Sequence, residues 1–255
     1  MLLWPCFLGL AISNGNLWDY LIFFIGTLAM RSAGCIINDI ADQDFDRQVN
    51  RTKTRPLASK QLTTSQALMA TIFFLCISLV AWFFLNTNAK YISLIGALLM
   101  VIYPFTKRFT SWPQLFLGIT FNFGLIVAVT HSGTLTLSIL ILFLSLVGWT
   151  IFYDTIYAFA DIKDDLKIGI KSTAIVMQQF PKTYLTICNV LIHIILLTFL
   201  RTEGLICIIP ITAGFFYLQT LLFKWKIENP QCCTETFSKC HFWGLGLWLW
   251  IVLTL

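Results

Sequence analysis

Long apolar runs separated by short polar connections extend along the whole chain. A transmembrane helix needs about 20 mostly apolar residues, within a range of about 17–25. By this criterion we expect nine membrane-spanning segments, at residues 2–13, 17–37, 66–86, 90–106, 113–130, 135–158, 183–200, 204–223 and 239–255. The first segment is too short for a complete crossing, so we expect its helix to be truncated or to begin upstream of Met1. The chain lacks the alternating strands and turns of a β-barrel.

The composition also indicates a membrane protein. Hydrophobic residues make up 58% of the 255 residues and charged residues 11%, whereas soluble domains are about 45–50% apolar and about 25% charged. A soluble cytosolic enzyme, a disordered chain and a secreted disulfide scaffold are therefore excluded. We expect an all-α fold, a polytopic membrane helix bundle, in a single domain that covers residues 1–255 without a linker.

The basic residues collect on one side of the predicted membrane. Fourteen of the 17 Lys and Arg residues lie on alternate connections between the predicted spans, while Arg31 lies inside the second span. Cytoplasmic loops carry an excess of Lys and Arg, so this side is predicted to face the cytoplasm. No Arg- and Ser-rich transit peptide precedes the first span, so we expect a bacterial inner membrane. The net charge of +5 thus reflects membrane topology and is no evidence for nucleic-acid binding.

Eight of the 12 acidic residues form two clusters, each at the cytoplasmic end of a predicted span. Carboxylates at or near membrane depth are costly and usually functional. The clusters are Asp39, Asp42, Asp44 and Asp46 after the second span, and Asp154, Asp161, Asp164 and Asp165 at the end of the sixth.

The first cluster is one-sided on a helix. Counted from Asn38 at about 100° per residue, Asp42 falls at about 40°, Asp46 at about 80° and Asp39 at about 100°. Asp44 falls at about 240°, on the opposite face. We therefore expect three carboxylates and one amide to point to the same place.

The second cluster forms a similar stripe. Counted from Asp154 on a continuous helix, Asp161 falls at about −20° and Asp165 at about +20°, with Tyr157 nearby and Asp164 about 80° away. Gathered carboxylates raise each other's pKa. A hard divalent cation removes this penalty, and Mg²⁺ typically binds through one or two carboxylates together with substrate phosphates. Two such sites facing each other, with Lys and Arg around them, are expected to clamp a diphosphate.

Two simpler interpretations of the charged and Cys-rich stretches explain less of the sequence pattern. A solvated helix end with mixed charges accounts for Asp44 and Asp164, but it leaves two one-sided stripes at equivalent places unexplained. Cys232, Cys233 and Cys240 with His241 fit no zinc-ligand spacing.

The motifs around both clusters resemble the UbiA family of membrane prenyltransferases. Residues 38–46 form an NDxxDxxxD motif, and the resemblance runs from about Leu3 to Ser172 before continuing as a pattern of spans. The stretches that carry it are RSAGC at 31–35, the motif at 38–46, RTKTRPL at 51–57, YPFTKR at 103–108, WPQ at 112–114, YDTIYAFADIKDD at 153–165 and KIGIKS at 167–172.

This resemblance implies a nine-helix bundle around a central cavity, with both Asp motifs at its cytoplasmic mouth. It implies Mg²⁺ as cofactor and an allylic polyprenyl diphosphate as donor within the membrane lipid. The implied metal ligands are Asn38, Asp39, Asp42, Asp46, Asp161 and Asp165. The implied catalytic residues are Asp42, Asp46, Asp161, Asp165 and Asp154. The implied substrate-binding residues are Asn38, Arg31, Tyr103, Lys107, Arg108, Tyr157 and Lys167.

Two of these roles stay open at the level of the sequence. Arg31 is expected either to hold the acceptor carboxylate or to pair with an acid of its own bundle. Asp154 is expected to orient a basic residue, to take a proton, or to extend the metal shell. The rings of Tyr103, Tyr153 and Tyr157 are candidates for stabilising a cation through their faces.

Within the family, residues 103–108 and 153–172 most resemble the branch that prenylates 4-hydroxybenzoate in ubiquinone biosynthesis. This implies transfer of the polyprenyl group to the ring carbon ortho to the hydroxyl. One alternative is a family member with another acceptor, such as a naphthoate, homogentisate or haem. Another is an ion-coupled transporter, although transporters tend to place their sites near the bilayer midplane. Nine apolar spans count against a soluble isoprenyl diphosphate synthase.

Overall fold

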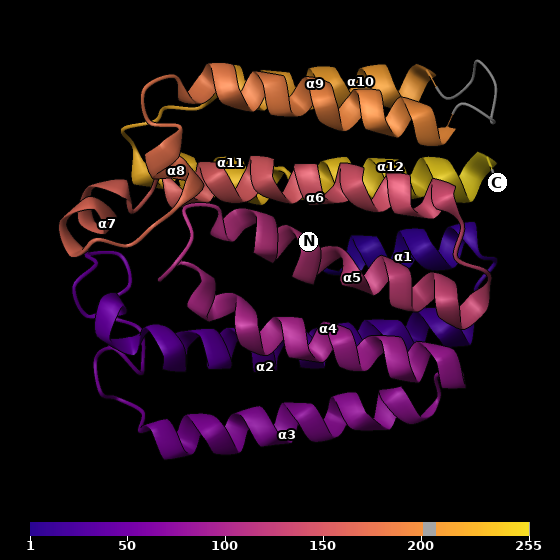
Figure 1. Cartoon of the computed structure of the whole chain (residues 1–255), viewed down its shortest axis with the longest axis horizontal. Helices are drawn as coiled ribbons and strands as arrows, with labels where there is room; N and C mark the ends of the chain where they lie inside the picture. Colours follow the sequence, from indigo (N-terminus) through magenta and orange to yellow (C-terminus); the bar gives the residue numbers. More distant parts are fainter. Residues whose placement is uncertain (201–207, 255) are drawn as a thin grey trace.

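The computed structural model describes residues 1–200 and 208–254. Over these residues the protein is all-helical, with twelve helices and no strand. In Figure 1 the longer helices run side by side, and the short helices α7 and α8 lie at one end of the bundle. The helices are α1 (Leu3–Ile12), α2 (Leu17–Asp46), α3 (Thr64–Phe83), α4 (Thr87–Thr106), α5 (Pro113–Ser132), α6 (Leu137–Ala158), α7 (Ile162–Ile168), α8 (Thr173–Val176), α9 (Pro181–Leu200), α10 (Ile208–Lys224), α11 (Pro230–Lys239) and α12 (His241–Thr254).

The helices confirm an all-α membrane bundle. By length and composition, six helices of the described residues are able to cross a membrane, namely α2, α3, α4, α5, α6 and α9. The other three predicted segments correspond to the shorter helices α1, α10 and α12. Each predicted segment thus coincides with one helix, although residues 204–207 of the eighth and residue 255 of the ninth lie outside the described residues.

Helix α2 is longer than the apolar pattern predicts. The predicted segment 17–37 ends where polar residues begin, but the helix continues to Asp46 and has 30 residues. At about 1.5 Å per residue it is about 45 Å long, which exceeds the hydrocarbon core of about 30 Å. Helix α2 therefore carries the first acidic cluster beyond the membrane interior on a continuous helix.

The second acidic cluster does not lie on one helix, and the expectation of a straight stripe is wrong. Helix α6 ends at Ala158, and Asp161 is the N-cap residue of α7. Between them the chain tightens, because Ala160 N donates to Tyr157 O at 3.0 Å and Asp161 N to Ala158 O at 3.2 Å. The break separates Asp154, which stays on α6, from the acids of α7.

Helix α6 forms the centre of the molecule. In its most apolar stretch 61% of the residues are buried, against 17% for α3 and for α4. Trp149, Phe152 and Ile156 of α6 are almost completely buried between neighbouring helices. The outer helices pack differently: α3 lies along α2 and α4 along α5, but α3 and α4 do not pack along each other.

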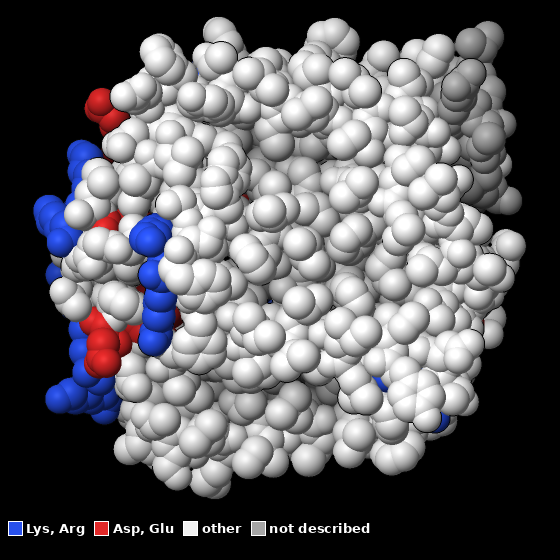
Figure 2. All heavy atoms as spheres, in the orientation of Figure 1, with Lys and Arg blue, Asp and Glu red and all other residues white. Residues whose placement is uncertain are grey.

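The charged side chains gather at one end of the bundle. Figure 2 shows this end, which holds α7, α8 and residues 47–63, the α2–α3 connection. The one-sided distribution of basic residues predicted from the sequence is therefore present in the folded chain.

A hydrogen-bonded pin closes the opposite end. Asn86 N donates to Nδ1 of His131 at 3.1 Å, and His131 Nε2 lies 3.1 Å from Asp19 Oδ1. Because Nδ1 accepts a hydrogen bond, the ring proton lies on Nε2, which donates a hydrogen bond to Asp19 Oδ1. The pin thus joins the start of α2, the α3–α4 turn and the end of α5.

Candidate active site

The first acidic motif turns two carboxylates inward. Asp42 and Asp46 are buried, with Asp42 only 2% exposed. The Asp44 side chain is 82% exposed and pairs with Arg47 at 2.9 Å. The predicted helical arc is thus confirmed, since Asp44 alone of the acids at 39, 42, 44 and 46 points to solvent.

Basic side chains neutralise the first motif. Arg55, from the α2–α3 connection, donates from one nitrogen to Asp39 Oδ1 and Asp46 Oδ2, both at 2.9 Å. These carboxylates hold the pKa of Arg55 above its usual value, although burial acts in the opposite direction. Lys107, at the end of α4, donates to Oδ2 of Asp42.

Asp42 keeps one oxygen without a partner. Its Oδ1 is buried and forms no hydrogen bond within the described residues. A buried charged oxygen without a partner is costly, so its presence indicates a position for a ligand. Arg108 lies beside this motif without entering it, because its guanidinium donates to Ala41 O at 2.7 Å and lies 5.7 Å from the Phe45 ring.

Arg51 holds the second motif. Its Nε donates to both oxygens of Asp161, at 2.8 and 3.1 Å, and a terminal nitrogen also donates to Asp161. The other terminal nitrogen donates to the Tyr157 hydroxyl at 2.7 Å. The guanidinium also lies over the Tyr157 ring, 4.7 Å from its centroid. Arg51 therefore links the α2–α3 connection to both α6 and α7.

The two other acids of α7 differ in their surroundings. Asp165 is buried and has no ion-pair partner among the described residues. Burial, and secondarily the charge of Asp161, raise the pKa of Asp165 to about 7. Asp164 accepts the backbone N–H of Asn50 at 3.0 Å, which lowers its pKa. Asp164 thus ties α7 to the α2–α3 connection, while Lys167, 3.6 Å from it, is 75% exposed and lies outside the cavity.

The carboxylates do not form a preassembled metal cage. Among the described residues, no three His, Cys, Asp or Glu side chains come close enough to hold a metal ion together. The reason is visible in the contacts, because Arg51, Arg55 and Lys107 stand between the acids. The donor set nevertheless fits a hard divalent cation, which takes oxygen ligands and shares them with substrate phosphates. The unpaired Oδ1 of Asp42 is an oxygen of this kind.

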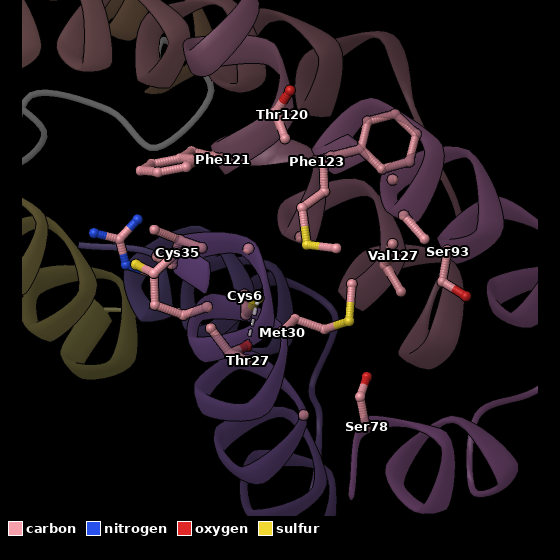
Figure 3. A pocket seen from close by; sticks show the side chains of 18 of the residues that line it. Cys6, Thr27, Met30, Cys35, Ser78, Ser93, Thr120, Phe121, Phe123 and Val127 are labelled. Atoms are coloured by element: carbon pink, nitrogen blue, oxygen red, sulfur yellow. Dashed lines mark hydrogen bonds between the residues drawn. The ribbon is translucent and has the colours of Figure 1, made fainter. Parts of the chain in front are cut away.

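A large apolar cavity reaches the charged end of the bundle, where Asn38, Asp39 and Arg55 line it. It has a volume of about 870 Å³ and lies between α2, α3, α4 and α5. Figure 3 shows Met30 of α2 together with Phe121, Phe123 and Val127 of α5 at its wall. Trp82 lines it near the end opposite the acids. Helices α3 and α4 both line the cavity, and they contact each other near their connection, where Trp82 Nε1 donates to Lys90 O at 3.2 Å and to Ser93 Oγ at 3.0 Å.

Few charged groups line the cavity away from its mouth. Arg31 and Asp154 both line it, and the Arg31 guanidinium lies 5.2 Å from the Phe121 ring centroid. Arg31 forms no ion pair with any acid of the described residues, which favours a role toward a ligand. Tyr103 and Tyr157 line the cavity. Tyr153 instead packs in the core, 5.1 Å from Trp149 between ring centroids.

The sequence interpretation missed the central place of Arg51 and Arg55. Both lie in the quoted stretch 51–57, but no role was assigned to them. Their spacing of four residues directly after the first motif was the available signal. Buried Gln114 was also missed; its Oε1 accepts Thr173 N at 3.0 Å and joins α5 to the start of α8.

The chain belongs to the UbiA prenyltransferase family, whose sequence model matches residues 2–251. Similar proteins include the 4-hydroxybenzoate octaprenyltransferase of Legionella pneumophila (strain Lens), 38% identical over 240 residues, which cover 92% of this chain and 84% of the relative. The enzyme of the same name from Francisella tularensis subsp. novicida (strain U112) is 37% identical over 266 residues, covering 99% and 91%.

Solved structures share the fold. A UbiA homolog from Aeropyrum pernix K1 superimposes with a TM-score of 0.80 at 23% identity, covering 96% of this chain and 95% of the other. A UbiA homolog from Archaeoglobus fulgidus, bound to GPP and Mg²⁺, has a TM-score of 0.72 at 15% identity, covering 98% and 96%. The membrane-embedded helical fold of this chain is therefore that of the family.

Proposed function

We propose that this protein is a 4-hydroxybenzoate polyprenyltransferase, which acts in an early membrane step of ubiquinone biosynthesis. It transfers a polyprenyl group from an allylic diphosphate to the ring carbon ortho to the hydroxyl of 4-hydroxybenzoate. The observation that carries the proposal is the apolar cavity of about 870 Å³, which reaches the charged end of the bundle at Asn38, Asp39 and Arg55. Tyr157, the hydrogen-bond partner of Arg51, lines it as well. The relatives at 37% and 38% identity that bear this activity in their names support the choice of acceptor.

The diphosphate of the donor binds at the charged mouth, with its tail in the cavity. When bound there, Mg²⁺ offsets the negative charge that develops on the leaving diphosphate. Asn38, Asp39, Asp42 and Asp46 hold one ion, and Asp161 and Asp165 the second. Arg51, Arg55 and Lys107 supply further positive charge to the same oxygens.

Reaction begins as the allylic C–O bond breaks and its electron pair leaves with the diphosphate. The carbon left behind is an allylic cation that water would capture. The apolar wall of the cavity excludes water, and the face of Tyr103, which lines the cavity, stabilises the cation.

The acceptor binds beside this cation. Arg31 holds its carboxylate, since the guanidinium lines the cavity without an ion-pair partner among the described acids. The ring carbon ortho to the hydroxyl forms the new C–C bond and then loses its proton. Asp154, which lines the same cavity, accepts that proton.

The distribution of the charges supports the proposed location. The end of the bundle that carries both motifs also carries most of the basic residues, as Figure 2 shows. We assign this end to the cytoplasmic side of a bacterial inner membrane.

A product assay tests the proposal. Membranes that lack this activity, containing the expressed chain, are given Mg²⁺, 4-hydroxybenzoate and geranyl diphosphate, and the prenylated acid is measured by mass. We expect a product that disappears with a chelator and in Asp42→Ala. Product with a naphthoate or homogentisate alone would reassign the acceptor, and no product with any acceptor would refute prenyl transfer.

A further inference from the structure

The three basic residues at the mouth occupy the acids that the proposed function assigns to metal ions. Arg55 bridges Asp39 and Asp46, Lys107 holds Asp42, and Arg51 holds Asp161. The two motifs therefore carry counter-ions from their own chain before any ligand arrives.

Arg51 is the most firmly placed of these counter-ions. Its guanidinium contacts both oxygens of Asp161, donates to the Tyr157 hydroxyl at 2.7 Å and lies over the Tyr157 ring. Bidentate pairing of Arg with a carboxylate is strong and directional, and stacking on an aromatic ring adds to it. Asp161 is thus engaged at both oxygens, whereas its neighbour Asp165 has no ion-pair partner among the described residues.

This arrangement binds a metal ion weakly when no diphosphate is present. It would have to share Asp161 with a guanidinium that repels it, because both are cations. A diphosphate is attracted to the guanidinium of Arg51, because its oxygens match the planar Arg donors as well as a carboxylate does. A diphosphate that takes the guanidinium of Arg51 leaves the oxygens of Asp161 to the metal.

The surrounding contacts allow this exchange without loss of the fold. The α2–α3 connection stays attached to α7 through Asn50 N and Asp164, and to α2 through the Thr52 hydroxyl, which donates to Asp46 O at 3.1 Å. Only the Arg51 side chain, 29% exposed, has to change its partner.

We propose that Arg51 keeps Asp161 closed to a metal ion until an allylic diphosphate takes over its guanidinium, so that metal and donor bind as a mutually dependent pair. This inference rests on the proposed function. It makes Arg51 a positioning residue that sets the order in which the site is filled. By linkage, donor then strengthens metal binding and metal strengthens donor binding by the same factor.

The test measures metal binding without turnover. Purified protein in detergent is titrated with Mn²⁺, and free Mn²⁺ is followed by its electron paramagnetic resonance signal. The donor probe is geranyl S-thiolodiphosphate, whose C–S bond resists cleavage, and a blank without protein is subtracted. In the wild type we expect this probe to lower the dissociation constant for Mn²⁺ by about tenfold.

Arg51→Gln is expected to bind Mn²⁺ alone about fivefold more tightly than the wild type. The probe should then add a smaller gain than in the wild type, because only direct coordination of the metal by the diphosphate remains. Arg47→Gln is the matched control, because it removes the same charge from the same connection at a residue that pairs with exposed Asp44. It should behave like the wild type. Arg51→Lys, which keeps the charge without the planar fork, is the second variant and should also bind Mn²⁺ alone more tightly than the wild type.

The possible outcomes test the role of Arg51 and the existence of the metal site separately. Equal Mn²⁺ binding with and without the probe in the wild type, or no gain in Arg51→Gln over Arg47→Gln, overturns the role of Arg51 and leaves the metal site in place. No saturable Mn²⁺ binding under either condition, in the wild type as in Asp42→Asn, overturns the proposed metal site and the inference with it.

Discussion

Asp42 is the most deeply buried acid of the two motifs, 2% exposed against 8% for Asp46 and 9% for Asp165. Lys107 contacts one of its oxygens, and the other is buried without a hydrogen-bond partner among the described residues. Removing one partner of a buried ion pair is far more costly than never having had the pair, because the remaining charge stays desolvated.

Lys107→Met is therefore expected to lower the free energy of unfolding by about 3 kcal/mol, because it leaves the Asp42 charge buried and uncompensated. The double variant Lys107→Met/Asp42→Asn should regain part of this stability but no activity. Thermal unfolding in detergent measures the first effect and the product assay the second. A double variant no more stable than Lys107→Met would contradict this account of the pair.

Arg31 provides the corresponding prediction for the acceptor. Arg31→Leu should raise KM for 4-hydroxybenzoate by roughly 10–100-fold, the value of a lost hydrogen bond to a charged group. KM for the donor should stay within a small factor, since Arg31 lies away from the counter-ions of the two motifs. Steady-state kinetics with each substrate varied in turn separates the two constants. If Arg31→Leu raised KM for the donor more than KM for 4-hydroxybenzoate, Arg31 would not be the residue that holds the acceptor carboxylate.

Burial of individual residues was predicted correctly where it depends on a single helix. The angles along residues 38–46 correctly separated exposed Asp44 from buried Asp42 and Asp46. These angles gave no information about Arg51, because its partners Asp161 and Tyr157 are more than a hundred positions away in the sequence. Contacts between distant segments depend on how the helices assemble, which helical periodicity does not contain.

At the scale of the element, the ends of helices were harder to predict than their existence. Apolar runs located each spanning helix, but α2 extends through polar residues to Asp46 because their side chains find partners in the folded protein. The break after Ala158 was missed for a related reason. Residues 154–165 are compatible with a continuous helix, and the turn serves to bring Asp161 to Arg51.

The pin formed by Asn86, His131 and Asp19 allows a test of how much the contact between α2, α5 and the α3–α4 turn stabilises the bundle. His131→Phe removes the hydrogen bonds to Asn86 and Asp19 and leaves the Asp19 carboxylate short of a donor. We expect a loss of about 1–3 kcal/mol in the free energy of unfolding. The product assay at low temperature should be nearly unaffected, because the pin lies at the end away from the acidic motifs. A variant that keeps its stability but loses activity would contradict a purely structural role for His131.

At the scale of the whole molecule, the cavity decides which donors fit. Gly96 of α4 lines it, and a Cβ at this position would lie 2.9 Å from Cδ1 of Phe123. Gly96→Leu should therefore narrow the cavity and reduce kcat/KM for a long polyprenyl donor by about tenfold relative to geranyl diphosphate.

Gly246→Leu is the control for this prediction. A Cβ at Gly246 of α12 meets no atom within 4 Å, and this glycine does not line the cavity. Its ratio of rates for long and short donors should equal that of the wild type. Equal ratios in all three proteins would mean that the tail does not follow α4.

The class of fold was predictable from the sequence because lipid imposes a simple rule, that each span must be long, apolar and helical. The cavity was not predictable from composition. Its walls are made by apolar residues of the same kinds that face lipid, such as Leu94 of α4, which lines it and is 56% exposed. Only the way in which α2, α3, α4 and α5 assemble around the cavity distinguishes its wall from the outer surface.

An apolar cavity that reaches a charged end makes the enzyme a catalyst between two phases. A polyprenyl donor dissolved in the bilayer reaches the protein by diffusion in two dimensions, while a charged acceptor arrives from water. The turnover rate then depends on how many donor molecules there are per lipid molecule, and no longer on their number per litre. Added lipid dilutes the donor even when its total amount is unchanged, and the thickness and order of the surrounding membrane become part of the kinetics.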